Sequence, residues 1–369
     1  MKAGIREIVM VVRFEAEKIQ SFLGDGKWLG ASISYVKQKR LGGTADAVKT
    51  VQKEFEGDGR FLVAYGDNYY DLKALDKFVK LNSQDLLIGA ALVDDPSRFG
   101  TLDVKKGSVV SIKEKVAGAK TGVVNAGIYV LDSMIFSTIA KTRKSQRGEF
   151  ELTDSLTMEI GNGRKLHAVH FDKKEWVGIT YPWDLLQANR SALDSEEEVR
   201  DGEVEVGVHL KGLVSMMKGS IVKSGSYVEG PVFIGENSVV GPNSYLRPGT
   251  SLGKETKVGA GCEVKNSIVM DDARIPHLSY VGDSVLGSGV SLGAGTITAN
   301  LKFNDSHVFS KVKGKTVDSG HRKLGAIFGD GVKTGVNVSV FPGVKIGTGA
   351  WIRPGAVVET DVPSGARVR

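Results

Sequence analysis

A six-residue apolar period runs through the second half of the chain and constrains its fold more than any other feature. Every sixth residue from Val204 to Met270 is apolar, twelve positions in succession. The period resumes over residues 286–298, and again in a shifted phase over residues 328–358. This pattern predicts a parallel β-helix, in which each rung is a short strand plus a corner and successive coils stack at about 4.8 Å.

The glycine content supports this prediction. The chain has 369 residues with 47 glycines and only 9 prolines, whereas glycine usually makes up about 7% of a globular protein. Small residues make the tight corners of a β-helix, where a Cβ atom is poorly tolerated. We therefore expect residues 196–369 to form the β-helix, and we expect its flat faces to favour association with further copies of the chain.

Residues 1–195 follow a different pattern, in which apolar strand-like runs alternate with helical ones. This alternation predicts an α/β, Rossmann-like domain with a mostly parallel sheet, ending near the acidic run at residues 196–198. Ligands of such sheets bind at the carboxyl ends of strands, where Asp67 and Asp184 fall. Two carboxylates there could hold magnesium. The alternative is a turn for Asp67 and a helix N-cap for Asp184.

Composition excludes several other classes of protein. Cys262 is the one cysteine, so an internal disulfide is excluded and a reducing, cytoplasmic location is expected. No apolar run reaches the roughly 18 residues of a membrane span, and the first residues do not resemble a signal peptide. The net charge of +6 decides little between anionic small substrates and nucleic acid. We expect small-molecule substrates, without a nucleic-acid or membrane partner.

Two interruptions of the repeat are candidate functional positions. Pro276 is predicted to break the period immediately before His277. Residues 300–325 have no six-residue period and are rich in lysine and arginine. Insertions in solenoid proteins form loops, and loops on a rigid scaffold often carry function. A merely solvated loop is the alternative for the second stretch.

The segment HLSYVGDSVLGSGVSLGAGTITANL, residues 277–301, resembles one family. This family is the bifunctional sugar-1-phosphate nucleotidylyltransferase/acetyltransferases, of the N-acetylglucosamine-1-phosphate uridylyltransferase/glucosamine-1-phosphate acetyltransferase type and especially the archaeal members. The resemblance covers nearly the whole chain. It implies a left-handed parallel β-helix of hexapeptide repeats, and a homotrimer with sites between neighbouring β-helices. It also implies acetyl transfer from acetyl-CoA to glucosamine 1-phosphate, coupled to UTP-dependent uridylyl transfer in UDP-N-acetylglucosamine biosynthesis.

The resemblance assigns roles to five residues of the β-helix. His277 matches the general base, and imidazole suits that role because it titrates near neutral pH. Tyr280 matches a ligand of the sugar phosphate, and Asn300 matches the asparagine that holds the acceptor. Arg247 and Lys265 match basic phosphate contacts. In the loop that follows, Ser306 and Phe309 stand where the family pattern leads us to expect lysines.

The first half carries a second set of matches. Positions that resemble nucleobase contacts are Gln38, Gly43 and Thr44, with one extra glycine departing from the pattern. Positions that resemble sugar contacts are Gly100, Glu114 and Asn125, although no proline follows Lys115. Asp67 and Asp184 match the two metal-binding positions, which implies Mg²⁺ as a cofactor beside acetyl-CoA as co-substrate.

One family motif is missing from the sequence. Members of the family open with a strand and a Gly-x-Gly-Thr-Arg loop, whose backbone amides hold the nucleotide phosphates. Because no such segment occurs here, we expect an N-terminally truncated domain and weak or absent uridylyl transfer. A start codon assigned too far downstream is the alternative explanation.

Two other functions remain open at this point. One is a non-catalytic regulatory subunit with the same two domains, which the intact His277 motif disfavours. The other is a glucose-1-phosphate nucleotidylyltransferase whose β-helix serves only oligomerisation.

Overall fold

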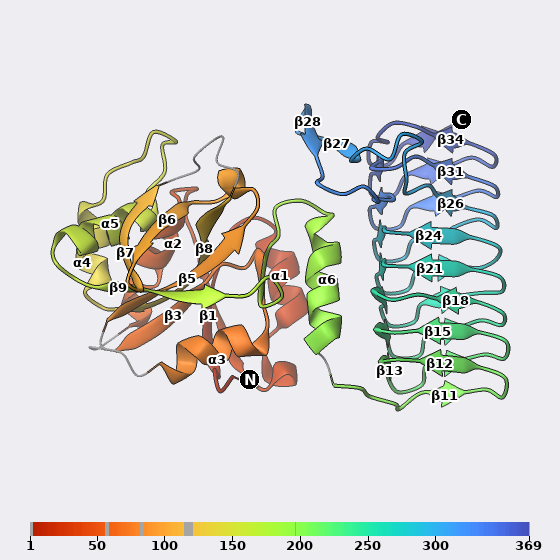
Figure 1. The fold of residues 1–369 in the computed structure, drawn as a ribbon, viewed down its shortest axis with the longest axis horizontal. Helices are drawn as coiled ribbons and strands as arrows, with labels where there is room; N and C mark the ends of the chain where they lie inside the picture. The colour runs from red at the N-terminus through yellow and green to blue at the C-terminus, as the bar shows by residue number, and fades with distance from the viewer. Residues whose placement is uncertain (1–2, 56–58, 82–84, 114–120, 196, 369) are drawn as a thin grey trace. The chain divides into compact units, whose positions relative to one another are not determined.

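The structure is a computed structural model that describes residues 3–55, 59–81, 85–113, 121–195 and 197–368. It divides into two compact units, Met1–Gly178 and Ile179–Arg369, shown in Figure 1 and described separately below. The helix α6 (Asp184–Ser195) belongs to the second unit. The domain limits predicted from the sequence place this helix with the first half, and they stay a prediction.

The first unit is built on a six-stranded sheet in the order β3-β8-β5-β9-β7-β6. These strands are β3 (Arg60–Ala64), β5 (Leu86–Val93), β6 (Thr101–Lys105), β7 (Ser108–Lys113), β8 (Gly122–Asp132) and β9 (Leu166–Phe171). Only β5 and β9 of this sheet pair in parallel. The predicted mostly parallel sheet is therefore wrong. The long strand β8 runs back between β3 and β5, and the β6–β7 hairpin adds an antiparallel edge.

Helices and short strands complete the first unit. The helices are α1 (Ala16–Leu23), α2 (Thr44–Thr50), α3 (Leu72–Lys80), α4 (Ile135–Lys141) and α5 (Leu152–Gly161), with the 3₁₀ turns η1 (Lys27–Leu29), η2 (Gln52–Glu54) and η3 (Pro96–Arg98). β1 (Glu7–Val12) and β2 (Ser32–Lys37) form a parallel pair of their own, and β4 (Asn68–Tyr70) pairs with β10 (Trp176–Gly178).

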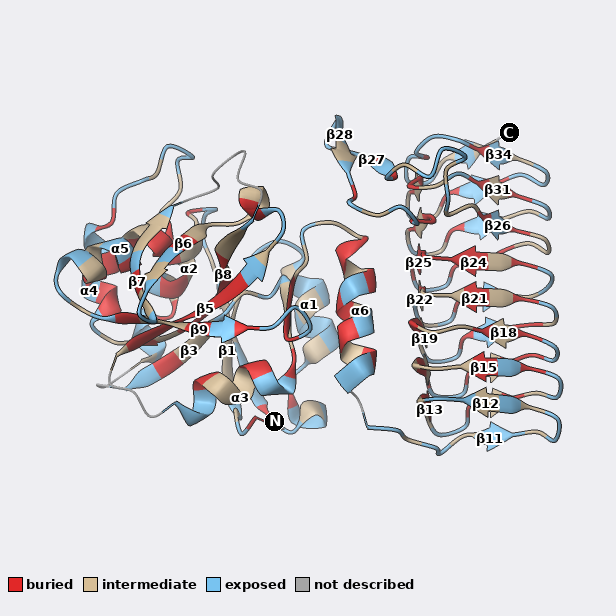
Figure 2. Ribbon diagram, viewed as in Figure 1, coloured by how far each residue is buried: buried red, intermediate tan, exposed pale blue. Residues whose placement is uncertain are grey.

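Strand β5 shows how the core of the first unit is divided. Leu86 and Ile88 pack in one cluster with α4 and α5, whereas Leu87 packs in another cluster with Phe78 of α3. Figure 2 shows β5 and much of β8 as buried. A strand covered on both faces is expected to be a continuous apolar run, and the sequence LLIGAALV of β5 fits this expectation.

The second unit is a parallel β-helix with three strand-bearing faces, as the sequence predicts. The first face holds β11 (Glu203–Val204), β14 (Ile221–Val222), β17 (Val239–Val240), β20 (Lys257–Val258) and β23 (Arg274–Ile275), and through bridges at Ser291 also β30 (Lys333–Thr334), β33 (Trp351–Ile352) and β35 (Arg367–Val368). The second face holds β12 (His209–Lys211), β15 (Tyr227–Glu229), β18 (Tyr245–Leu246), β21 (Glu263–Lys265), β24 (Tyr280–Gly282), β26 (Ile297–Thr298), β31 (Ser339–Val340) and β34 (Val357–Val358). The third face holds β13 (Val214–Met216), β16 (Val232–Ile234), β19 (Thr250–Leu252), β22 (Ile268–Val269), β25 (Val285–Leu286), β29 (Ile327–Phe328) and β32 (Lys345–Ile346).

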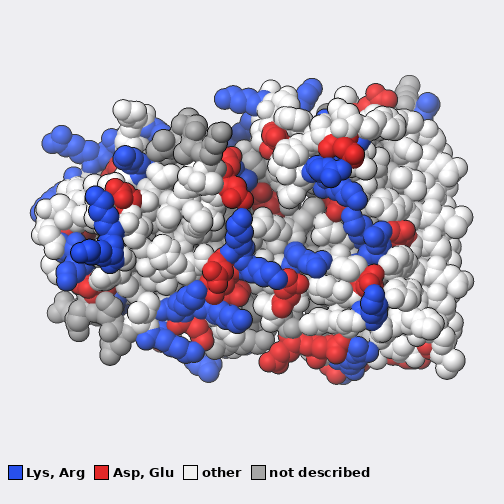
Figure 3. All heavy atoms as spheres, in the orientation of Figure 1, with Lys and Arg blue, Asp and Glu red and all other residues white. Residues whose placement is uncertain are grey.

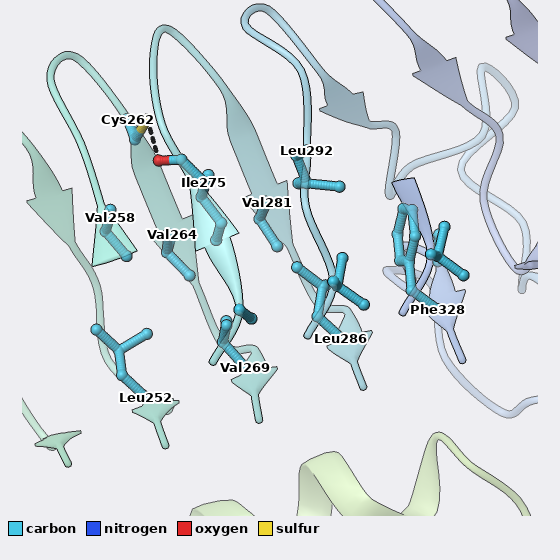
Figure 4. Close-up of a cluster of buried hydrophobic side chains, with 14 of the residues drawn as sticks. Leu252, Val258, Cys262, Val264, Val269, Ile275, Val281, Leu286, Leu292 and Phe328 are labelled. Carbon is cyan, nitrogen blue, oxygen red and sulfur yellow. Dashed lines mark hydrogen bonds between the residues drawn. The ribbon is translucent and has the colours of Figure 1, made fainter. Parts of the chain in front are cut away.

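Apolar side chains stack in register inside the β-helix, as Figure 4 shows for Val258, Val264 and their neighbours. The coil from Val240 to its partner Val258 takes eighteen residues, but the coils from Leu252 to Val269 and from Val269 to Leu286 take seventeen each. One residue is missing after Val264, and another after Val281. Because each deletion lies at the same corner, the strands on both sides keep their pairing.

These deletions correct two predictions. Met270 was expected in the core, yet Val269 is buried there and Met270 is 36% exposed. The period was expected to break at Pro276, yet Ile275 and Val281 are six residues apart and both fully buried. The phase shifts instead where this corner is one residue shorter, after Val264 and again after Val281.

Residues 301–324 form the predicted insertion. It contains the antiparallel hairpin of β27 (Phe309–Val312) and β28 (Lys315–Asp318). Val308 and Leu324 of the insertion pack with Trp183 and Leu186, which lie at and within the start of α6. Within the residues that the structure describes, no helix is both long enough and apolar enough to cross a membrane.

Candidate active site

The shortened corner of the β-helix brings four predicted site residues together. Arg247 follows β18, Lys265 ends β21, Tyr280 begins β24, and Asn300 lies two residues beyond β26. Lys265 pairs with Gly282 on the next coil. Residues far apart in sequence therefore occupy neighbouring coils of one face.

The carboxylate of Asp283 lies at the centre of this group, and it is only 4% exposed. It accepts hydrogen bonds from Lys265 Nζ at 3.2 Å and from Asn266 Nδ2 at 2.7 Å. The amide of Asn300 donates to Asp283 Oδ2, and also to the hydroxyl of Tyr280 at 3.0 Å. Asp283 thus links Lys265 to Asn300, and Asn300 contacts Tyr280 directly.

A pocket of about 250 Å³ opens beside this network, and Arg247 and Lys265 line it with Arg190, Pro248, Asn266 and Asp283. Arg247 Nη1 donates to Glu263 Oε1 at 2.8 Å, and this hydrogen bond raises the pKa of the guanidinium. Both cations are thus held by carboxylates. A guanidinium and an ammonium fixed side by side are well suited to a phosphate.

The chain carries only a small excess of basic over acidic residues. On the face of the molecule in Figure 3, basic and acidic side chains are interspersed. The whole chain has 49 basic against 43 acidic residues. The pocket is therefore defined by the placement of its cations rather than by an overall positive field.

Tyr280 is half-buried, and burial raises the pKa of its hydroxyl. The hydroxyl therefore stays protonated at neutral pH. Because Asn300 already donates to its oxygen, the phenol can direct its own proton towards a ligand. Tyr280 thus offers a donor to a hydroxyl or phosphate oxygen.

His277 lies at an exposed corner, between Pro276 and Leu278, whose φ is +49°. Its carbonyl accepts hydrogen bonds from Ser279 Oγ at 2.8 Å and from Gly295 N at 3.1 Å, which fix the backbone. Among the described residues, the imidazole has no hydrogen-bond or ion-pair partner. The structure leaves this ring accessible to a ligand or to another chain.

Sequence reasoning missed the charged and polar residues that organise the pocket: Arg190, Glu263, Asn266 and Asp283. The five-residue steps from Val264 to Val269 and from Val281 to Leu286 mark the corner that holds Asn266 and Asp283. That signal was present in the sequence. Arg190 comes from helix α6, so only the packing of the second unit places it at the pocket.

The predicted nucleobase contacts lie together in the first unit. Gln38 Nε2 donates to the carbonyl of Gly43 at 3.3 Å, and Thr44 Oγ1 accepts from Leu152 N at 2.9 Å. Gly43 has a φ of +93°, and a Cβ there would lie 2.6 Å from Phe150 O. Glycine is therefore required at this turn for packing as well as conformation.

The predicted sugar contacts meet at β8. Asn125 N donates to Gly100 O at 2.8 Å, and Asn125 Nδ2 donates to Tyr129 OH at 2.7 Å. Desolvation raises the pKa of the buried Tyr129 far above its ordinary value, so this hydroxyl serves as a neutral partner. Glu114 lies outside the described residues.

The two predicted metal ligands fall in different units. Asp67 is exposed, and its Oδ1 accepts from Asn68 Nδ2 at 3.0 Å. Asp184 is buried, and its Oδ2 accepts from Thr180 N and Tyr181 N at 2.8 Å each. The Asp184 carboxylate therefore binds backbone amides of the loop that precedes α6. No group of three or more His, Cys, Asp or Glu side chains gathers as a metal site in the described parts of the chain, and the metal pair stays a prediction.

Comparison with known proteins finds family matches for both units. A nucleotidyl transferase family model matches residues 1–195, and a model described as the GMPPB C-terminal domain matches residues 228–340. The chain is 40% identical to the bifunctional protein GlmU of Methanococcus maripaludis, over 97% of the chain and 85% of that protein. It is 38% identical to the bifunctional protein GlmU of Methanocaldococcus jannaschii, over 98% of the chain and 85% of that protein. A bifunctional sugar-1-phosphate nucleotidylyltransferase/acetyltransferase of Sulfurisphaera tokodaii is 40% identical, over 99% of the chain and 88% of that protein.

A nucleotidyl transferase unit followed by a β-helix with a basic pocket defines a class of two-domain transferases. The chain belongs to the family of bifunctional sugar-1-phosphate nucleotidylyltransferase/acetyltransferases. The predicted resemblance is thereby confirmed. The names of these relatives also favour an enzyme over a regulatory subunit.

Proposed function

We propose that the second unit transfers an acetyl group from acetyl-CoA to the amine of an amino-sugar 1-phosphate, glucosamine 1-phosphate, as a step towards UDP-N-acetylglucosamine. The pocket at the shortened corner is the observation that carries this proposal. It sets Arg247 and Lys265 beside Asp283, whose carboxylate also accepts from Asn300. Such a set of charged and neutral donors matches a phosphate joined to a hydroxyl-rich ring.

Each residue then has a distinct role. Arg247 and Lys265 hold the phosphate, while Tyr280 and Asn300 orient the sugar ring. His277 takes a proton as the amine attacks the thioester carbonyl, so that a C–N bond forms and the C–S bond breaks. The departing thiolate of coenzyme A receives a proton, and N-acetylglucosamine 1-phosphate is released.

The proposed site is completed in a homotrimer. Exposed apolar side chains lie close in sequence to the site residues: Leu278 is 71% exposed, and Phe303 is fully exposed. A second copy packed on this surface would bury them and would bring its own groups to the accessible ring of His277. Light scattering that gives the mass of one chain would contradict this assembly.

The first unit is proposed to serve nucleotidyl transfer from UTP. Asp67 is the proposed magnesium ligand of this unit, because its exposed carboxylate is oriented by Asn68 and hard oxygen ligands suit that ion. Asp184, which belongs to the second unit, stays the second predicted ligand. The bound ion would neutralise phosphate charge. The expectation of weak uridylyl transfer stays a prediction, which pyrophosphate release from UTP and N-acetylglucosamine 1-phosphate would test.

Thiol release from acetyl-CoA tests the proposed acetyl transfer. Glucosamine 1-phosphate should react with a kcat/KM about a hundredfold above that of glucosamine. Losing two charge-assisted phosphate contacts costs roughly 1.5 kcal/mol or more for each contact. Equal rates for the two sugars would contradict a phosphate site, and no thiol release with either sugar would contradict acetyl transfer.

A glycine beside the pocket gives a second test. A Cβ at Gly282 would lie 2.4 Å from Tyr280 OH and 2.8 Å from Asn300 Nδ2. We expect Gly282→Ala to separate these two side chains and to raise the KM for glucosamine 1-phosphate about tenfold. Steady-state kinetics with acetyl-CoA saturating would measure this. An unchanged KM would argue against any role of the Tyr280–Asn300 contact in acceptor binding.

A further inference from the structure

We propose that Asp283 is the positioning residue of the acceptor site, holding Lys265 from one coil and Asn300 from another in the arrangement that binds the sugar phosphate. This inference rests on the proposed function. Neither the family motif nor the sequence pattern assigns Asp283 a role. Its contacts with the side chains of two other coils do.

The carboxylate of Asp283 is surrounded by donors. Oδ2 accepts from Lys265 and Asn300, and Oδ1 accepts from Asn266 at 2.7 Å. With 4% exposure, this charge is stable only because it is paired and hydrogen-bonded. Lys265 and Asn266 come from the coil before Asp283, and Asn300 from the coil after it. One buried charge thus fixes side chains from both neighbouring coils.

The backbone of Asp283 is also held by hydrogen bonds. Its N–H donates to Lys265 O at 2.9 Å, and its carbonyl accepts from Gly325 N at 2.8 Å. Gly325 lies where the insertion returns to the β-helix, and the preceding Leu324 N donates to Asn300 O at 3.0 Å. The same residue therefore also fixes the base of the insertion that leaves from Asn300.

The corner geometry explains why an aspartate stands here. Both coils that lack one residue are shortened at this corner, where Asn266 has a φ of +44° and Asp283 a φ of +49°. Among residues other than glycine, Asn and Asp adopt this left-handed conformation most readily. Asp283→Asn should therefore keep the backbone and the side-chain shape while it removes the charge.

A direct role in binding the phosphate is unfavourable for Asp283. Its negative charge repels an anionic ligand and offsets the charge of Lys265. Coulombic repulsion alone therefore predicts that Asp283→Asn lowers the KM for glucosamine 1-phosphate. Positioning predicts the opposite sign, because the new amide places donor hydrogens against Lys265 or Asn300 and disperses them. The direction of the change separates the two explanations.

The experiment compares Asp283→Asn with Asp271→Asn in the full chain. Asp271 is a matched control, because it also sits at a β-helix corner, where it accepts from Lys254 N at 2.9 Å. Asp283→Asn should raise the KM for glucosamine 1-phosphate about tenfold, with the KM for acetyl-CoA matching the control. An unchanged or lowered acceptor KM would overturn the proposal, as would an equal rise in the KM for acetyl-CoA.

A substrate-free measurement separates this proposal from the proposed function. Limited labelling of the folded protein with acetic anhydride, read by mass spectrometry, reports how freely Lys265 Nζ reacts. Asp283→Asn should raise labelling of Lys265 about threefold, because Lys265 Nζ released from the carboxylate is more accessible to the reagent. Asp271→Asn should leave this labelling unchanged. Increased labelling in a protein without acetyl transfer would support positioning and reject the function. Unchanged labelling would reject positioning.

Discussion

Replacing His277 with alanine should reduce the kcat of acetyl transfer by roughly 10²- to 10⁴-fold, the contribution typical of general base catalysis. The reason is local: the attacking amine must lose a proton, and His277 is the proposed acceptor of that proton. The KM for glucosamine 1-phosphate should change little, because Arg247 and Lys265 still hold the phosphate. Thiol release at saturating acetyl-CoA measures the effect.

His209→Ala is the matched control for this variant. His209 is another exposed histidine of the β-helix, on β12, and it packs near Tyr227 with ring centroids 6.2 Å apart. Both variants should keep the free energy of unfolding within about 0.5 kcal/mol of wild type, since exposed side chains contribute little to stability. A wild-type rate for His277→Ala would show that the assignment of the base is wrong.

Phe328→Ala should lower the free energy of unfolding of the β-helix by about 3–5 kcal/mol, the usual cost of removing a buried phenylalanine side chain. Phe328 is 2% exposed, and it stacks between Leu286 and Ile346 on neighbouring coils. Figure 4 shows its ring among the apolar side chains of the core. Neighbouring coils are held in register by backbone hydrogen bonds, so they cannot close the cavity. Urea unfolding followed by circular dichroism measures the change.

Phe14→Ala provides the comparison, because Phe14 lies in the first unit and is 82% exposed. The same substitution there should change stability by no more than about 0.5 kcal/mol. Similar destabilisation by both variants would contradict a core centred on the stacked residues. A small effect of Phe328→Ala alone would mean that the coils can repack.

The β-helix was predictable from sequence because its periodicity is local. Each rung repeats after six residues, so the spacing of Val258 and Val264 alone marks both as core residues, without knowledge of the rest of the fold. Met270 was misplaced because counting in sixes cannot register a missing residue, whereas backbone pairing can. In the first unit the antiparallel course of strand β8 depends on long-range pairing that no local pattern encodes.

The candidate site was predictable to the extent that its residues belong to a motif. Lys265, Tyr280 and Asn300 were expected to act together. In the structure Asp283 links Lys265 to Asn300, and Asn300 contacts Tyr280 directly. Asp283 itself was missed, because a buried carboxylate that organises other residues looks in sequence like any turn aspartate. Arg190 could not be found, since its place depends on how α6 packs against the β-helix.

The two seventeen-residue coils have a consequence for how such a pocket can arise. A solenoid absorbs a lost residue at one corner without disturbing the strands on either side, as the intact pairing of Val264 with Val281 shows. Two single-codon deletions in an ordinary eighteen-residue repeat would therefore tighten one corner and draw side chains of adjacent coils together. Binding geometry in this β-helix depends on the length of the turn, a variable that evolution can change without altering a single core side chain.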